Sequence, residues 1–564
     1  MKLQVNLHSP MTNPTTRQSL RSFLGFLSIF LFHFAVSAEV KPPGIFGDHM
    51  VLQQDKTIPI WGTAAVGETI TVSLGTATGK TTADGNGKWR VDLPAQPGTS
   101  IAQELVISGT NTLKFQDVLL GDVWLCSGQS NMGFTLKDAQ NAATEIPKSA
   151  DPQYRFFVVG RKTSGIPQTD VISGKWELCD PTSVPHLSAV AYFFGRELRQ
   201  SLQRPIGLIT TTWGGTPAEA WTSYSGLQKS PELAHYLEAY QQVQDRAAKV
   251  TPEMKATFEE KMVPWKSAFD ASTAEWQKAV DVAKAAKQPL PPQPKPATPM
   301  PVNPDPFAFP PGFPNIPTCL FNGMVSPLIP YAIKGAIWYQ GESHGKHPEE
   351  YRVLFPAMIT DWREKWGEGD FPFLFVQLPA FQAGVDSWPL IREAQLLALS
   401  LPNTGMAITI DTADPGQLHP PNKLPVGLRL ARAAHHVAYG EKVVGSGPIY
   451  DSMKIEGSAI RISFKANSIG GGLSSGPPAL PAAATTHLKA FFLAGADQKF
   501  VPATATIDHD TLLISSEAVS APIAVRYSWE NIPSGNLYNK EGLPASPFRT
   551  DDWAAIPAPA APAK

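Results

Sequence analysis

The middle of the chain alternates short, mostly apolar runs with longer stretches whose apolar residues recur at helical spacing. Mostly apolar runs indicate strands buried on both faces, and the stretches between them indicate amphipathic helices that cover those faces. The predicted strands are 123–126, 154–159, 206–212, 335–339, 373–378 and 406–410, and the predicted helices are 189–202, 349–366, 391–401 and 424–439. The alternation predicts a three-layer αβα domain with a mainly parallel sheet over residues 119–440.

The segments on either side of this domain show short strands separated by turn residues. Residues 39–118 contain the runs 50–52, 58–61, 69–72 and 89–93, and residues 441–548 contain the runs 460–464, 488–493, 512–514 and 523–527. Each segment therefore predicts a β-sandwich-like domain. The end of the chain, 549–564, is rich in Ala and Pro and predicts a disordered tail.

Residues 231–317 interrupt the α/β alternation. The part 231–287 is rich in Ala, Glu, Lys and Gln, which predicts two or three helices. In the part 289–317, 13 of the 29 residues are proline, which excludes both helix and central strand. We interpret 231–317 as an insertion in the α/β domain, and its role stays open between a lid or rim over the substrate and a surface appendage.

The N-terminus has the layout of an export signal. Residues 1–38 hold three cations and no carboxylate, and an apolar run over 23–36 precedes the small residues Ser37 and Ala38. This pattern predicts a signal peptide cleaved after Ala38, and hence a periplasmic or extracellular protein without a membrane attachment. The alternative is a membrane anchor, but the apolar run is shorter than the ~20 residues that span a bilayer.

Composition narrows the possible partners. Of the 564 residues, 43% are apolar and 17% are charged, which excludes a largely disordered or fibrous protein. The 47 Lys and Arg against 49 Asp and Glu leave no basic excess for nucleic acid, so no nucleic-acid partner is expected. Three cysteines cannot form a disulfide framework. The sequence does not indicate an oligomeric state.

The first candidate catalytic residue follows the first strand of the α/β domain. Ser130 stands in Gly128-Gln129-Ser130-Asn131, where an open α/β sheet exposes side chains at its carboxyl edge. Its hydroxyl would lie beside backbone N–H groups at a helix start, which favour developing negative charge. A capped helix start would show the same residues, so this motif alone leaves catalysis open.

The ends of three later strands carry complementary groups. Gly214 and Gly215 permit close approach of the backbone to a ligand. Gln340 could donate its amide to an oxyanion, and His419 could take a serine proton near neutral pH. Tight turns, polar loops and helix caps use the same residue types. The ordered occurrence of all four groups at strand ends of one domain nevertheless favours a serine hydrolase.

The motifs together resemble a known family. The segments GQSNM, WGGTPAEAW and WYQGES, with the stretch from His419 to Ala431, closely resemble the sialate O-acetylesterase family, whose members are carbohydrate esterases of the SGNH, or GDSL-like, hydrolase superfamily. The resemblance runs from Phe46 at least to Ala431 and is weaker over 231–317 and the last hundred residues. It implies an SGNH-hydrolase-like fold for the central domain.

The resemblance also implies roles. Ser130 would take the acetyl group, and His419 would act as general base and then acid. The oxyanion hole would combine the N–H groups of Ser130 and of Gly214 or Gly215 with the side chain of Gln340. No metal and no organic cofactor is implied.

The orienting carboxylate departs from the superfamily pattern. Many members carry an Asp three residues before the histidine, a position that Gly416 occupies here. Asp414 is the first choice for the partner of His419 and Asp411 the second. A Ser-His dyad with a backbone carbonyl as orienting group is a further alternative.

The expected substrate is an O-acetylated carbohydrate, with sialate first because the family is named for it. Acetylxylan or another polysaccharide is the alternative, and a non-catalytic carbohydrate-binding protein is the alternative from another class. A sialate carboxylate favours an arginine, for which Arg392 is a candidate. The predicted substrate-binding residues are Asn131, Glu342, Trp213 and Arg392.

Overall fold

The structure is a computed structural model that describes residues 39–286, 288–308, 314–384, 387–412, 414–477 and 487–553. The predicted signal peptide, 1–38, lies outside these residues. Within the described ranges, no helix combines the length and the apolar character that crossing a bilayer requires.

A sheet of seven consecutively paired strands forms the centre of the α/β domain. Its order is β13-β12-β11-β7-β10-β8-β9, and all neighbours are parallel except β8 and β9. The strands are β7 (Thr112–Gly128), β8 (Asp151–Val158), β9 (Trp176–Cys179), β10 (Ile206–Thr212), β11 (Gly335–Tyr339), β12 (Phe373–Gln377) and β13 (Thr404–Ile408). The predicted α/β class with a mainly parallel sheet is confirmed.

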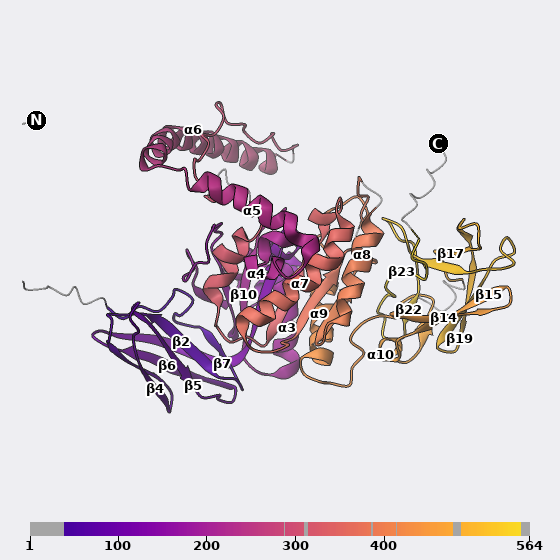
Figure 1. The fold of residues 1–564 in the computed structure, drawn as a ribbon, viewed down its shortest axis with the longest axis horizontal. Coiled ribbons are helices and arrows are strands. Elements are labelled where there is room, and N and C mark those ends of the chain that lie inside the picture. The colour runs from indigo at the N-terminus through magenta and orange to yellow at the C-terminus, as the bar shows by residue number, and fades with distance from the viewer. Residues whose placement is uncertain are drawn as a thin grey trace, which may run out of the picture. The chain divides into compact units, whose positions relative to one another are not determined.

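Helices cover both faces of this sheet (Figure 1). Trp124 of β7 packs against Phe194 of α3, whereas Trp338 of β11 packs against Trp362 of α7. Trp124 pairs with Gly335, so Trp338, three residues further along β11, points to the opposite face. α3 (Ala189–Leu202) packs against α9 (Leu424–Val437), and α7 (Pro348–Trp366) packs against α8 (Trp388–Leu397).

The boundary predicted between residues 118 and 119 falls inside one continuous strand. The first half of β7 pairs with β6 (Thr99–Ser108), and residues 122–128 pair with β10 and β11. β7 therefore belongs to both the N-terminal β domain and the central sheet. Sequence patterning suggested a boundary because the strand changes there from alternating to continuous burial. The other N-terminal strands are β1 (Val51–Gln53), β2 (Ile58–Thr63), β3 (Thr69–Leu74), β4 (Ala77–Thr82) and β5 (Lys88–Leu93).

The insertion contains two helices, α5 (Ala234–Ala247) and α6 (Pro252–Ala285). The Pro-rich chain returns along α6, because the indole N–H of Trp265 donates to the Thr298 carbonyl and that of Trp276 to the Pro291 carbonyl, each at 3.0 Å. Figure 1 shows this pair of segments away from the central sheet. The choice between a lid and an appendage stays a prediction.

The C-terminal segment forms two four-stranded sheets and a short two-stranded one. The larger sheets are β14 (Tyr450–Glu456), β15 (Ala459–Phe464), β20 (Thr511–Ser515) and β19 (Thr504–Asp508), and β18 (Val501–Pro502), β17 (Phe491–Ala494), β21 (Ala524–Tyr527) and β23 (Phe548–Arg549). The tail predicted over 549–564 therefore needs correction at its start. Arg549 bonds to Glu393, and Asp551 to Arg526, so these residues are held by ion pairs. The rest, 554–564, lies outside the described residues.

Candidate active site

Ser130 and His419 meet at the carboxyl edge of the central sheet. Ser130 begins the short helix α1 (Ser130–Gly133) directly after β7, and His419 lies in the loop between β13 and α9. The Ser130 Oγ lies 2.7 Å from the His419 Nε2. This is the distance at which an imidazole takes a proton from a hydroxyl.

The turn that presents Ser130 depends on Gly128. Its φ is +141°, and a Cβ there would lie 2.2 Å from the Tyr339 carbonyl oxygen. Glycine alone tolerates both conditions. The Gln129 N–H donates to the same carbonyl at 3.0 Å, which ties the turn to β11. The chain consequently reverses sharply at the end of β7 and leaves the Ser130 side chain half-buried.

The loop after β10 brings Gly214 against Ser130. A Cβ on Gly214 would lie 3.3 Å from the Ser130 Cβ, and Gly215 has a φ of +73°. Both glycines are exposed. Neither N–H group donates to another residue in the described part of the chain. The loop can therefore supply backbone donors next to the serine, as an oxyanion requires.

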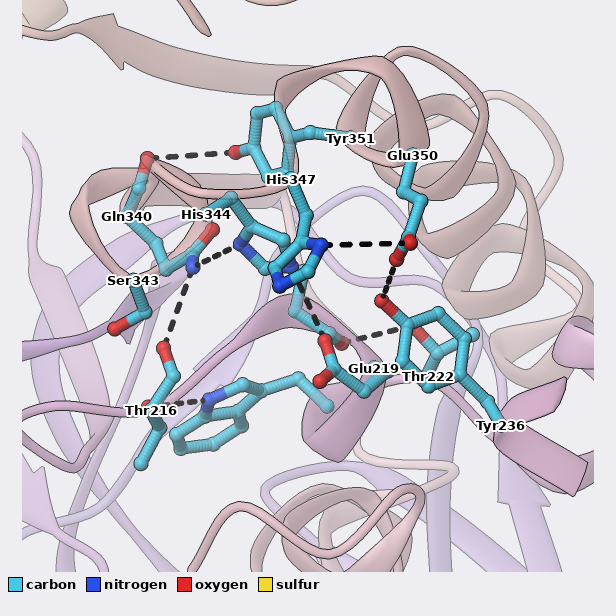
Figure 2. A network of polar contacts seen from close by, with 12 residues as sticks. Thr216, Glu219, Thr222, Tyr236, Gln340, Ser343, His344, His347, Glu350 and Tyr351 are labelled. Atoms are coloured by element: carbon cyan, nitrogen blue, oxygen red, sulfur yellow. Dashed lines mark hydrogen bonds and ion pairs between the residues drawn. The ribbon is translucent and has the colours of Figure 1, made fainter. Parts of the chain in front are cut away.

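Gln340, whose side chain is predicted to donate to an oxyanion, contacts two neighbouring residues. Its side chain is fully buried, and its Nε2 donates to the Thr216 carbonyl at 3.3 Å and to the His344 Nδ1 at 3.1 Å. These two contacts use both protons of the amide (Figure 2). The sequence motif placed Gln340 directly after β11 but did not reveal that Thr216 and His344 each accept one of its N–H groups. Its oxyanion role stays a prediction.

Asn131 and Glu342 bond to each other beside the pair formed by Ser130 and His419. The fully buried Asn131 donates through Nδ2 to Glu342 Oε1 and, at 3.0 Å, to the Leu418 carbonyl. Its Oδ1 accepts from the Nζ of buried Lys423. The bond to Leu418 fixes the residue that precedes His419, and the burial of Asn131 corrects its predicted substrate-binding role to a positioning contact. Glu342 is partly exposed, and its substrate-binding role stays a prediction.

Electrostatics at this junction favour the neutral form of His419. Burial lowers the pKa of Lys423 to about 7, with Glu342 opposing that shift. Burial raises the pKa of Glu342. Burial, followed by the positive charge of Lys423, lowers the pKa of His419. A lowered pKa favours the neutral imidazole, the form that acts as a general base.

The carboxylates predicted to orient His419 are engaged elsewhere. Asp414 accepts the Gly416 N–H at 3.1 Å, and Asp411 binds Arg429 through both oxygens at 2.6 and 2.8 Å. The structure therefore does not pair Asp414 with His419. Counting only described residues, the His419 Nδ1 has no hydrogen-bond partner.

The loop that carries His419 is braced by contacts that the sequence did not reveal. The Tyr538 hydroxyl, from the C-terminal β domain, donates to Asp411 at 3.2 Å. The Gln382 N–H donates to the Pro415 carbonyl at 3.0 Å. Both partners lie far from the loop in sequence, and no local pattern indicates them.

Arg392 cannot meet a substrate carboxylate. It is fully buried and donates to the backbone carbonyls of four residues, Leu378, Pro379, Glu530 and Asn531. Burial lowers its pKa to about 9. Two of these carbonyls belong to the C-terminal segment, so Arg392 joins the two domains and its predicted substrate role is corrected.

Trp213 lies at the site with 6% of its surface exposed. The guanidinium of exposed Arg161 stands 5.7 Å from the centroid of the Trp213 ring.

A cleft of about 1160 Å³ lies away from this site. It is lined in part by Trp61, Tyr224 and Tyr240, and includes neither Ser130 nor His419. Over the residues that the structure describes, no three His, Cys, Asp or Glu side chains stand close enough to hold a metal ion.

Known proteins resemble this chain over most of its length. A sequence model of carbohydrate esterases, described as sialic acid-specific acetylesterase, matches residues 321–436. The rat sialate O-acetylesterase is 32% identical over 71% of this chain and 74% of its own length. The mouse sialate O-acetylesterase is 29% identical over 89% and 92%. The crystal structure of a carbohydrate acetylesterase from Xanthomonas citri superposes with a TM-score of 0.73, at 34% identity, over 91% of this chain and 100% of that one.

Proposed function

Since the chain belongs to the sialate O-acetylesterase family of carbohydrate esterases, and is thus a carboxylic-ester hydrolase, we propose that it is an exported serine esterase. It removes O-acetyl groups from carbohydrate through an acetyl-serine intermediate. The observation that carries this proposal is the 2.7 Å contact between the Ser130 Oγ and the His419 Nε2 beside the glycine loop.

Acylation begins with attack of the Ser130 Oγ on the acetyl carbonyl carbon, while the His419 Nε2 accepts the hydroxyl proton. The carbonyl oxygen becomes an oxyanion, which the backbone N–H groups of Ser130 and Gly214 or Gly215 stabilise. One such donor is typically worth about 3 kcal/mol in the transition state. His419 then returns the proton to the sugar oxygen as the ester C–O bond breaks, which leaves acetyl-serine and the free sugar hydroxyl.

Deacylation repeats these steps with water. His419 takes a proton from water, and the resulting hydroxide attacks the acetyl-serine carbonyl. The second tetrahedral intermediate collapses, acetate leaves, and the proton returns from His419 to the Ser130 Oγ. The lowered pKa of His419 supports this cycle because it favours the neutral imidazole, the form that accepts a proton in each attack.

The orientation of His419 rests on its loop. Asp414 bonds to Gly416, so we propose a Ser-His dyad whose histidine is positioned by the Asn131 bond to the Leu418 carbonyl and by the Gln382 bond to Pro415. Positioning through the backbone can replace a third side chain, provided that the loop holds one conformation.

O-acetylated sialate is the first candidate substrate, because the relatives carry that name. A neutral acetylated polysaccharide such as acetylxylan is the second. The burial of Arg392 favours it, since the arginine predicted for a sialate carboxylate is not available to a ligand.

The test is acetate release from 4-nitrophenyl acetate by the chain without residues 1–38, beside Ser130→Ala and His419→Ala. Activity in the parent and its loss in both variants would establish the serine esterase. Acetylated sialic acid and acetylxylan would then be compared at equal acetyl concentration. Equal background rates in all three proteins would instead favour the non-catalytic carbohydrate-binding alternative. N-terminal sequencing of the exported protein would test cleavage after Ala38.

A further inference from the structure

Two loops flank the strand that presents Ser130, and hydrogen bonds between their side chains and backbone join them. The loop after β10 carries Gly214, Gly215, Thr216 and Glu219, and the segment after β11 carries Gln340 and His344. β10 and β11 lie on either side of β7 in the sheet. Gln340 Nε2 reaches the Thr216 carbonyl at 3.3 Å, and His344 Nε2 lies 3.1 Å from Glu219 Oε2 (Figure 2). We call Glu219, His344 and Gln340 the loop clamp.

In the loop clamp, Gln340 donates to His344, and His344 donates to Glu219. Gln340 Nε2 lies 3.1 Å from His344 Nδ1, and an amide nitrogen can only donate. His344 Nδ1 is therefore the acceptor, so the proton of the neutral ring is on Nε2 and points to Glu219. Rotating the Gln340 amide by half a turn would set its oxygen against the Thr216 carbonyl, acceptor against acceptor. The hydrogen-bond network thus favours this amide orientation and this tautomer, while the buried Gln340 Oε1 has no partner among the described residues.

Burial makes the clamp rigid. Gln340 and Thr216 are 0% exposed and His344 is 2% exposed. Hydrogen bonds that water cannot reach are stronger, and breaking them leaves unpaired polar groups in the interior. The hydroxyl of Thr216 adds two bonds within its own loop, to the Trp213 carbonyl at 2.8 Å and from the Trp221 indole at 2.9 Å.

The glycine loop requires such support. Gly214 and Gly215 are exposed, and two adjacent glycines leave the backbone with many accessible conformations. An oxyanion donor is effective only when it already points to where the charge will develop. Thr216 follows directly after Gly215, and Gln340 fixes its carbonyl. Glu219, three residues further along, is fixed by His344.

We propose that Glu219, His344 and Gln340 are positioning residues that hold the Gly214–Gly215 backbone in place for the oxyanion. The proposal rests on the proposed esterase function and gives Gln340 a role through the loop, not as a direct donor. The clamp acts when charge develops on the carbonyl oxygen, so it affects kcat and leaves ground-state binding of the ester nearly unchanged.

The test compares His344→Leu, Glu219→Gln and Gln340→Leu with the parent and with His347→Leu. His347 lies on the same segment, its side chain is 62% exposed, and among the described residues that side chain makes a polar contact only with Glu350, at 3.6 Å, so it is the matched control (Figure 2). Rates with 4-nitrophenyl acetate are divided by the concentration of sites that react with an organophosphate serine probe. We expect kcat to fall by about 10- to 100-fold in His344→Leu, and less in Glu219→Gln, which keeps an acceptor oxygen. KM should stay within twofold, and the control should match the parent.

Phenylboronic acid supplies a readout that a loss of stability would not move. It forms a tetrahedral anionic adduct with a catalytic serine, so its inhibition constant should rise in parallel with the loss of kcat/KM, while inhibition by acetate stays unchanged. Parental kcat in both His344→Leu and Glu219→Gln, or a change confined to KM, would overturn the proposal. A large loss in Gln340→Leu alone would make Gln340 a direct donor and would also overturn it.

If His344→Leu does not fold, the isosteric Glu219→Gln tests the loop clamp. Ser130→Ala distinguishes a failure of the loop clamp from a failure of the proposed esterase function. An unchanged rate in Ser130→Ala would refute the esterase function, whereas an inactive Ser130→Ala beside fully active clamp variants would refute the clamp alone.

Discussion

Replacing Asn131 by Leu should impair catalysis without touching the reacting atoms. The buried side chain of Asn131 makes three hydrogen bonds, to Glu342, to the Leu418 carbonyl and from Lys423. Leucine has the same branching and the same number of side-chain heavy atoms, and it can make none of these bonds. The substitution therefore releases the backbone directly before His419 and leaves two ionisable partners unpaired.

The magnitude follows from these partners. An unsatisfied buried polar group costs about 1–3 kcal/mol, and Glu342 and Lys423 offset part of that cost because their charges are opposite. We expect a loss of about 3 kcal/mol in the free energy of unfolding. A displacement of His419 by about 1 Å can lower the rate about 100-fold. We therefore expect kcat to fall about 100-fold.

The assay combines urea unfolding with kcat for 4-nitrophenyl acetate at a temperature where the variant is fully folded. Asn141→Leu is the matched control, because the Asn141 side chain makes no hydrogen bond with another described residue. A folded Asn131→Leu protein with kcat within threefold of the parent would refute the inference that this junction positions His419.

Lys423→Met removes the second cause of the lowered His419 pKa, so that pKa should rise towards its usual value. The acid limb of the kcat/KM profile should then move to higher pH. A limb that stays in place or moves to lower pH would contradict the electrostatic effect of Lys423. Arg392→Met should lower the free energy of unfolding by at least about 3 kcal/mol, because four backbone carbonyls lose their donor. The ratio of sialate to acetylxylan activity should stay unchanged. A selective loss of sialate activity would restore the predicted substrate role of Arg392. Gly128→Ala should destabilise the protein by about 3 kcal/mol or more, whereas Gly47→Ala, which has open space around its Cβ, should change the free energy of unfolding by less than about 1 kcal/mol; thermal unfolding of both variants decides this.

Much of the fold was readable from the sequence because it is encoded locally. The predicted strands 206–212 and 335–339 and the helix 189–202 coincide with β10, β11 and α3. Each is specified by the spacing of its own apolar residues, and burial in a sheet covered by helices on both faces makes that spacing continuous. The change in the β7 pattern was visible as well, but a single sequence could not reveal that one strand serves two sheets, because partner strands decide this.

In the candidate site, too, some features were predictable from the sequence and others were not. Ser130, Gly214 and His419 were predictable because each stands at the end of a strand, where parallel topology brings the chain to one edge of the sheet. The partners of loop side chains were not predictable. Asp414 accepts the N–H of Gly416, and Gln340 donates to the Thr216 carbonyl. Arg392 donates to the carbonyls of Glu530 and Asn531.

The sequence by itself determined the alternation of strands and helices, the glycine turn, and the positions of Ser130 and His419, which we propose as nucleophile and base. Only the tertiary structure decided which polar groups pair, because contacts such as Ser130–His419 and Gln340–Thr216 join residues more than 100 positions apart. A loop side chain carries several donors and acceptors of similar strength, and local sequence does not rank them. The pairing is decided by which partners the packed core brings within about 3 Å while excluding water, since a buried group left unpaired destabilises every alternative arrangement.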